Sequence, residues 1–242
     1  MDTIPSYRQR LPHWLNLWMP LFILVYPFIL SVPSLNWEKD LYREYGLIEN
    51  LTVAFLAAAI VLFLRSLRRA DGLVHRAWLV LLAAGAFVFL GEEISWGQHY
   101  FNWVTPEEWK EMNRQGETNL HNIKGGVEYF FTKVAREGLS LATIIGGILV
   151  PLHLRRKKAD FTPGTLWFWV WPSLGGALTA LLSATIRLPN SIAHQFGKVD
   201  CLPPFLGEDI GEMKECYLAL FILLYALTQF RITRRLPAAG TS

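Results

Sequence analysis

The adjacent glutamates Glu92 and Glu93 end a long apolar run, in the stretch LGEEISWGQHY between Leu90 and Tyr100. An ionised carboxylate that leaves water is costly unless it finds a cation, a hydrogen-bond donor or a proton. A carboxylate beside a histidine can transfer protons, or the two can hold a divalent metal ion that activates water. This stretch is therefore the first candidate for chemistry.

Helical spacing groups the candidates that follow. If the apolar run continues as one helix, the spacing i, i+3, i+4, i+7 places four side chains on one face: Glu92, Ser95, Trp96 and His99. We predict that Glu92 and His99 are catalytic, and that Ser95 and Trp96 contact the substrate. Glu93 points about 100° around the helix axis, toward a neighbouring helix. We predict that it also takes part in catalysis.

Other segments supply ionisable residues at a similar depth. Glu49 lies near the start of another apolar segment and is a predicted catalytic residue. In GETNLHN, Glu117 and His121 are four residues apart, so they would share a face if that stretch were helical.

Carboxylate oxygens and imidazole nitrogens are common ligands of divalent metal ions. The predicted ligand set is Glu93, Glu117, His121 and His194. Arg187 ends another apolar segment, and we predict that it binds a phosphate or carboxylate headgroup through paired hydrogen bonds.

Structural roles are the alternative for each of these residues. Glu92 or Glu93 could form a salt bridge with Arg187, and the histidines could make ordinary boundary hydrogen bonds. The acidic residues that open the last apolar segment are also favoured there because acids stabilise helix N-termini; they are Glu208, Asp209, Glu212 and Glu215. The sequence contains no HExxH, CxxC, GxSxG or glycine-rich phosphate motif.

The elements that position these residues are membrane spans. Hydrophobic residues make up 52% of the chain and charged residues 18%, whereas soluble proteins carry about 25% charged residues. Six segments approach the 20 or so apolar residues that cross a bilayer. They are 14–32, 46–65, 77–98, 137–154, 165–187 and 213–230. We therefore predict an all-α, six-span transmembrane helix bundle that forms a single integral membrane domain over residues 1–242.

Basic residues indicate the orientation. Arginine and lysine cluster at 8–10, 65–76, 155–158 and 231–235, which are alternate connections and therefore lie on one side of a six-span bundle. The positive-inside rule makes that side the cytoplasm, so both termini are predicted to be cytoplasmic. The long connection 99–136 is then extracytoplasmic. Its TPEE sequence predicts an amphipathic helix with Thr105 as N-cap, which Gly116 can end.

GEEISWGQ and GETNLHN resemble a pattern found in uncharacterised bacterial multi-pass membrane proteins, and EYGLIENLT resembles the opening of the second span in the same proteins. This resemblance implies an integral protein of the cell (inner) membrane. It brings no known activity.

Three functions remain open at this point. The first is an enzyme that acts on a lipid or lipid-linked substrate at an outward-facing Glu/His pocket, through acid–base chemistry or a divalent metal ion. The second is a non-catalytic subunit or assembly factor with protein partners in the membrane. The third is a proton- or cation-coupled carrier. The net charge of +3 argues against a nucleic-acid partner, and Cys201 and Cys216 could be bridged or free.

Overall fold

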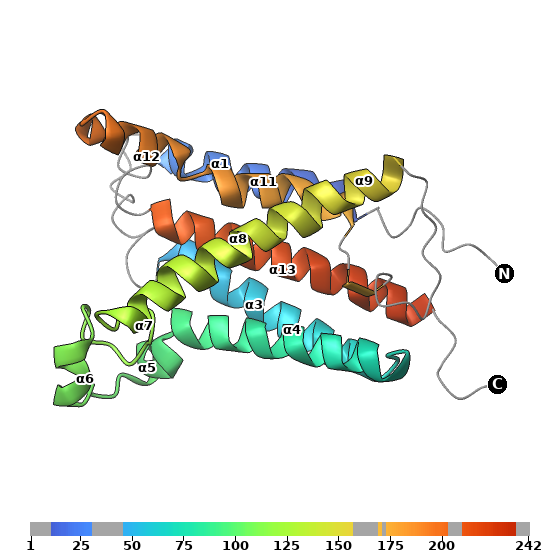
Figure 1. Cartoon of the computed structure of the whole chain (residues 1–242), viewed down its shortest axis with the longest axis horizontal. Helices are drawn as coiled ribbons and strands as arrows, with labels where there is room; N and C mark the ends of the chain where they lie inside the picture. Colours follow the sequence, from blue (N-terminus) through green and yellow to red (C-terminus); the bar gives the residue numbers. More distant parts are fainter. Residues whose placement is uncertain (1–10, 31–45, 157–168, 171–172, 203–209, 236–242) are drawn as a thin grey trace.

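The computed structural model of the protein describes residues 11–30, 46–156, 169–170, 173–202 and 210–235. These residues form helices joined by turns (Figure 1). No strand occurs among them, and Asn113 and Ile123 make an isolated β-bridge. The described part of the chain therefore confirms the predicted all-α fold class.

Four helices are long and apolar enough to cross a membrane. They are α3 (Leu47–Leu67), α4 (Gly72–Glu93), a continuous helix over Tyr129–Arg156, and α13 (Ile210–Arg235). The continuous helix comprises η4 (Tyr129–Ala135), α8 (Arg136–Ile144), η5 (Ile145–Leu149) and α9 (Val150–Arg156). These helices correspond to the predicted second, third, fourth and sixth spans.

The predicted first and fifth spans are shorter where they are described. The first is η2 (Trp14–Trp18) followed by α1 (Met19–Leu30). The fifth contains η6 (Leu174–Gly176), α11 (Ala177–Thr185) and α12 (Leu188–Gln195), with a break at Ile186 and Arg187 ahead of Pro189. Residues 31–32, 165–168 and 171–172 of these two predicted spans lie outside the described residues.

Helix α13 is the centre of the bundle. It packs against α3 and α11, whereas α4 packs against α3 and α8 packs against α11. In the most apolar 18-residue stretch of α13, 78% of the residues are buried, compared with 33% in α3 and 22% in α4. Two glycines allow close approach, because a Cβ at Gly147 or Gly176 would lie 2.6 Å or 2.9 Å from the ring of Phe221. The interior is therefore built around the last helix of the chain.

One end of the bundle gathers the basic connections. The Arg69 guanidinium donates a hydrogen bond to the carbonyl of Arg234, so the α3–α4 turn lies beside the end of α13. The start of α4 and the ends of α9 and α13 lie together at the right in Figure 1.

Aromatic and polar side chains hold residues 169–170 in place at that same end. Tyr225 donates to the carbonyl of Val170 at 2.8 Å and accepts a hydrogen bond from Trp78. The ring of His75 stacks on Trp169 with a centroid separation of 3.5 Å.

The opposite end carries short elements in place of the predicted longer helices. They are η3 (Ser95–Gly97), α5 (Gln98–Phe101), α6 (Glu107–Met112) and α7 (Gly126–Glu128). Helix α6 confirms a helix in this connection but corrects its ends. Pro106 is the N-cap, and Thr105 accepts a hydrogen bond from Gln98 instead of capping the helix. The helix ends at Met112, well before Gly116.

Candidate functional site

The chain leaves helix α4 directly after the two glutamates. Ser95 and Trp96 have φ angles of 46° and 56°, and Gly97 follows with 103°. Left-handed backbone at non-glycine residues costs about 1–3 kcal/mol each and tends to persist only where surrounding contacts enforce it. The indole of Trp96 folds back onto Gly91, where an added Cβ would lie 2.9 Å from the ring. This turn corrects the prediction of one continuous helical face, because the helix ends before Ser95, Trp96 and His99.

Glu92 is buried and joins the turn to the loop that follows α6. Its Oε1 accepts a hydrogen bond from the Trp96 indole at 2.7 Å. Its Oε2 accepts bonds from the backbone N–H groups of Leu120 and His121, at 2.8 Å and 2.9 Å. The same oxygen lies 3.2 Å from Nδ1 of His121. An ionised carboxylate can only accept hydrogen bonds, so the contact places the proton of the ring on Nδ1.

His99 lies between two carboxylates from different segments. Its Nδ1 is 3.2 Å from Glu49, at the start of α3, and its Nε2 is 3.1 Å from Glu117. Both ring nitrogens must donate to these acceptors, which requires the protonated imidazolium. Burial alone would lower the pKa of His99, but the hydrogen bonds and charges of Glu117 and Glu49 outweigh it and raise the pKa to about 9.

The carboxylate of Glu117 is also held by hydrogen bonds from several side chains. Burial opposes its ionisation, yet the hydrogen bonds from His99 and Ser95 hold its pKa below the ordinary value. Ser95 donates to Glu117 at 2.5 Å, and Asn119 donates to both residues. Since the Ser95 side chain is fully buried and its proton is committed, this serine is not placed as a nucleophile.

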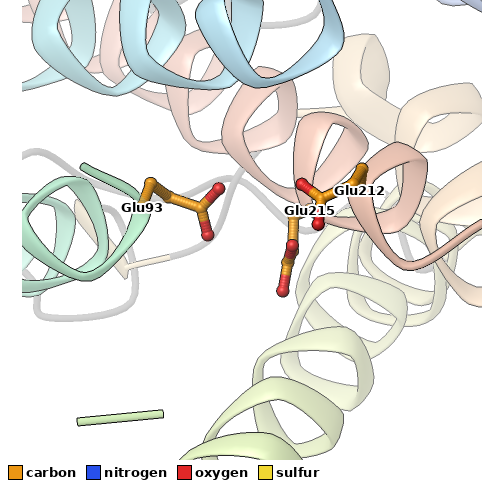
Figure 2. Close-up of side chains that lie close together, drawn as sticks. All are labelled: Glu93, Glu212 and Glu215. Atoms are coloured by element: carbon orange, nitrogen blue, oxygen red, sulfur yellow. The ribbon is translucent and has the colours of Figure 1, made fainter. Parts of the chain in front are cut away.

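The second glutamate, Glu93, faces a different group. Figure 2 shows its carboxylate pointing from α4 toward Glu212 and Glu215 on α13. One oxygen from each of the three lies within 4.8 Å of the others. Arg136, at the start of α8, forms an ion pair with Glu215. Three close carboxylates repel one another, so a proton or a bound cation would lower the electrostatic energy of the cluster.

A second ion pair lies next to this cluster on α13 and α8. The Lys214 ammonium donates to Glu137 at 2.7 Å, and Lys214 is buried. The charge of Arg187 also acts favourably on Glu137. The predicted anchor Arg187 is therefore placed near this pair, whereas Arg136 is the arginine beside the glutamates.

A groove of about 330 Å³ runs from these polar groups along the bundle. Its polar end is lined by Glu92, Glu93, His121, Arg136 and Glu215. Its walls are apolar and come from α4, from η4 and α8, and from α13, and they include Leu82, Phe89, Leu139, Leu218 and Ile222. Volumes of roughly 300–1,000 Å³ are typical of small-molecule sites. The chain thus combines an apolar groove with a charged end.

The structure divides the predicted metal ligands among different places. Glu117 contacts His99, His121 contacts Glu92, and Glu93 faces the acidic residues of α13. His194 is exposed on α12, which lies across the bundle from α5 and α6 (Figure 1). The stretch containing Glu117 and His121 is a loop rather than a helix, so the predicted shared helical face does not form. These four residues do not make one ligand set.

The oxygen atoms of Glu93, Glu212 and Glu215 form a different candidate set. Their chemistry suits a hard cation such as Mg²⁺, Mn²⁺ or Ca²⁺, which prefers carboxylate oxygen. Opposite ligands of a Ca²⁺ ion lie up to about 5 Å apart, so a separation of 4.8 Å is compatible with shared coordination. Arg136 contacts Oε1 of Glu215, so a cation held by this residue would share its carboxylate with the guanidinium.

Arg136 was not among the site residues predicted from the sequence. Glu212 and Glu215 were predicted mainly to stabilise the N-terminus of a helix. The available signal was a basic residue directly before the fourth predicted span, 137–154, at the end where Glu93 was expected. Glu208 and Asp209, from the same acidic run, lie outside the described residues. Cys201 is exposed and Cys216 is buried, and both are free thiols.

No protein-family model matches the chain, and neither a curated protein nor a solved structure matches it significantly. The function is therefore argued from the site alone.

Proposed function

We propose that the protein is an integral membrane enzyme that carries out acid–base chemistry on a lipid or lipid-linked substrate. The observation that carries this proposal is the contact between His121 Nδ1 and the buried Glu92 at the charged end of an apolar groove. A substrate with an apolar chain and a polar group fits such a groove, because its two parts meet surfaces of matching polarity.

His121 is the general base in this proposal. Glu92 orients the ring through Nδ1, which leaves Nε2 as the nitrogen able to take a proton. A carboxylate in this position also stabilises the imidazolium that forms after proton transfer. Glu92 is thus a positioning residue, and its hydrogen bonds to the loop backbone fix the base in place.

Glu93 supplies the second acid–base group. It lines the groove and stands next to Glu215, so the two carboxylates disfavour simultaneous ionisation. In the free protein a proton retained between them offsets their repulsion, and it can be delivered to a leaving group when a cationic group of the substrate takes its place. Arg136 lies at the same end and can orient a substrate oxygen.

His99, Glu49 and Glu117 take a positioning role in this proposal. Both nitrogens of His99 are occupied by carboxylates, so the ring has no lone pair for a proton or a metal ion. The three residues connect the start of α3, helix α5 and the loop that carries His121.

A divalent metal ion would be held by Glu93, Glu212 and Glu215. Bound there, it would lower the pKa of a coordinated water or polarise a substrate oxygen. Elemental analysis of the purified protein tests this part of the proposal. A stoichiometric metal that is lost in Glu212→Gln supports the site, and a metal-free protein with full turnover removes it.

A carrier is less well supported than an enzyme. Along α13, the acidic residues at 212 and 215 are separated from Tyr225 and Gln229 by the apolar stretch 218–224. The described residues offer no continuous polar path between the two ends of the bundle along this helix.

The proposed topology keeps six spans, with the basic end in the cytoplasm and the groove's charged end outside. Arg69 and Arg234 share one end of the bundle, whereas the end of α4 and helices α5 and α6 lie at the other (Figure 1). Cysteine labelling from either side of the membrane tests this orientation.

The test of activity uses the full chain in vesicles of mixed phospholipids, with products identified by mass spectrometry. Conversion should require the protein and fall at least about 10²-fold in His121→Gln. The matched control is Glu108→Gln, which changes an exposed carboxylate on α6. Absence of any converted lipid, or full conversion by the His121 variant, would dispose of the proposal.

A further inference from the structure

The groove is open at the outer surface of the helix bundle. Leu81 and Val88, both on α4, line it while remaining 62% and 41% exposed. Helix α4 packs against α3, α8 packs against α11, and α13 packs against both α3 and α11, so the groove lies between α4 and α8 with α13 as its third wall. A membrane lipid can therefore reach it by lateral diffusion, without leaving the bilayer.

The charges at the polar end are predominantly negative. Three carboxylates line the groove there, those of Glu92, Glu93 and Glu215. Among the lining residues, all of which are described, Arg136 is the one with a permanent positive charge. Glu92 is satisfied by the loop and by Trp96, and Glu215 by Arg136. The described contacts give Glu93 neither a hydrogen bond nor a direct ion pair.

This distribution of charge favours one class of lipid headgroup over another. A purely anionic lipid would bring its phosphate to Arg136 but would add negative charge beside Glu93. A zwitterionic headgroup avoids this, because its phosphate can contact the guanidinium while its ammonium contacts the carboxylate of Glu93. A short linker joins the phosphate and the amine of such a headgroup, and Arg136 and Glu93 line the same groove from α8 and α4.

We propose that the groove binds a phospholipid whose headgroup carries a primary amine, with the phosphate at Arg136, the ammonium at Glu93 and one acyl chain between α4, α8 and α13. This inference names the substrate class and rests on the proposed function for its chemical consequence, although binding can be measured without turnover. The acyl chain would contact Leu82, Leu139 and Ile222.

Photo-crosslinking tests the proposal directly. The purified full chain is placed in phosphatidylcholine vesicles that contain a trace of diazirine-tailed phosphatidylethanolamine or diazirine-tailed phosphatidylglycerol. Phosphatidylethanolamine should crosslink about tenfold more efficiently, which corresponds to about 1.4 kcal/mol. The crosslinked peptides should fall in α4, α8 and α13.

Two variants separate the parts of the interaction. Glu93→Gln should reduce the preference for the amine to about twofold or less, whereas Glu108→Gln should leave it unchanged. Leu82→Trp should fill the apolar groove and reduce crosslinking of both lipids, so it reports on the groove even if Glu93→Gln folds poorly. Equal crosslinking of the two lipids, an unchanged preference in Glu93→Gln, or crosslinks confined to other helices would overturn the inference.

The outcomes also distinguish this inference from the proposed function. Selective binding of phosphatidylethanolamine without any lipid conversion removes the enzyme and keeps the binding site. Conversion of phosphatidylglycerol with no preference for the amine keeps the enzyme and removes the headgroup assignment.

Discussion

The imidazole of His121 lies 3.2 Å from the carboxylate of Glu92, across a separation of 29 residues in the chain. The same carboxylate accepts hydrogen bonds from the backbone of Leu120 and His121. One buried side chain therefore fixes both the loop and the orientation of the ring that the loop presents to the groove.

Replacing Glu92 with glutamine should lower the turnover of the converted lipid by about 10²–10⁴-fold. The amide cannot stabilise the imidazolium, and it can equally well present its NH₂ group to Nδ1 and select the wrong tautomer. Turnover in vesicles measures the effect, with Glu108→Gln as the matched glutamate control. A Glu92→Gln protein as active as the native one would mean that His121 is not the base.

Hydrogen exchange should follow the pH dependence of the His99 contacts. The pKa of His99 rises from the ordinary 6.5 to about 9 in the folded protein, so folding binds a proton more tightly. Its contribution, on the order of 3 kcal/mol, is complete below about pH 6.5 and disappears as the pH rises through about 9. Amides of the loop 113–125 should therefore exchange faster, beyond the intrinsic rate increase, between pH 6.5 and 9.

The control for this dependence is Glu117→Gln. Loss of one carboxylate should bring the pKa of His99 closer to 6.5 and move the transition to lower pH. A loop whose protection is flat from pH 6 to 9.5 in the native protein would contradict the assignment of a protonated His99.

Two glycines of α4 provide a matched pair of substitutions. Gly91→Ala should destabilise the protein by about 1–3 kcal/mol, because its Cβ would lie 2.9 Å from the Trp96 ring and the turn would have to shift. Gly85→Ala meets no atom within 4 Å and should be neutral or slightly stabilising, as alanine is the better helix former. Thermal unfolding in one detergent compares the two. Equal melting temperatures would show that Trp96 does not pack as described.

The stability of the protein should change in opposite directions when the acidic cluster loses the carboxylate of Glu93 and when it loses the guanidinium of Arg136. Glu93→Gln removes one of three close carboxylates, so its melting temperature should stay the same or rise. Arg136→Gln leaves Glu215 without its ion-pair partner and should lower the melting temperature by about 5–10 °C. A destabilised Glu93→Gln protein would instead indicate that a bound cation holds the cluster together.

The length of the apolar segments was sufficient to place the four long helices, because about 20 consecutive apolar residues leave few alternatives to a helix. It could not place the end of α4. The strained turn at Ser95 and Trp96 depends on Glu92 and on the ring packing over Gly91, and neither contact has a local sequence pattern. Helical spacing therefore predicted a shared face for residues that in fact lie on either side of a turn.

The residues that gather at the candidate site could be predicted from the sequence, but the contacts between them could not. Glu92, Glu93, Glu49, His99, Glu117 and His121 all lie at one end of the bundle. Which histidine meets which glutamate depends on how the loop 113–125 folds, and that loop is fixed by long-range contacts such as Gln98 with Thr118. Arg136 was missed because a single arginine at the start of an apolar segment has no motif around it.

The burial of α13 has a consequence for biosynthesis. Helix α13 follows α3, α4, α8 and α11 in the chain, and 78% of its most apolar 18-residue stretch is buried. Until it arrives, α3 and α11 lack their common partner, and Glu93 has neither Glu212 nor Glu215 across from it. The groove therefore gains its third wall only after synthesis has passed Ile210, and a nascent chain that stops before this residue lacks that wall.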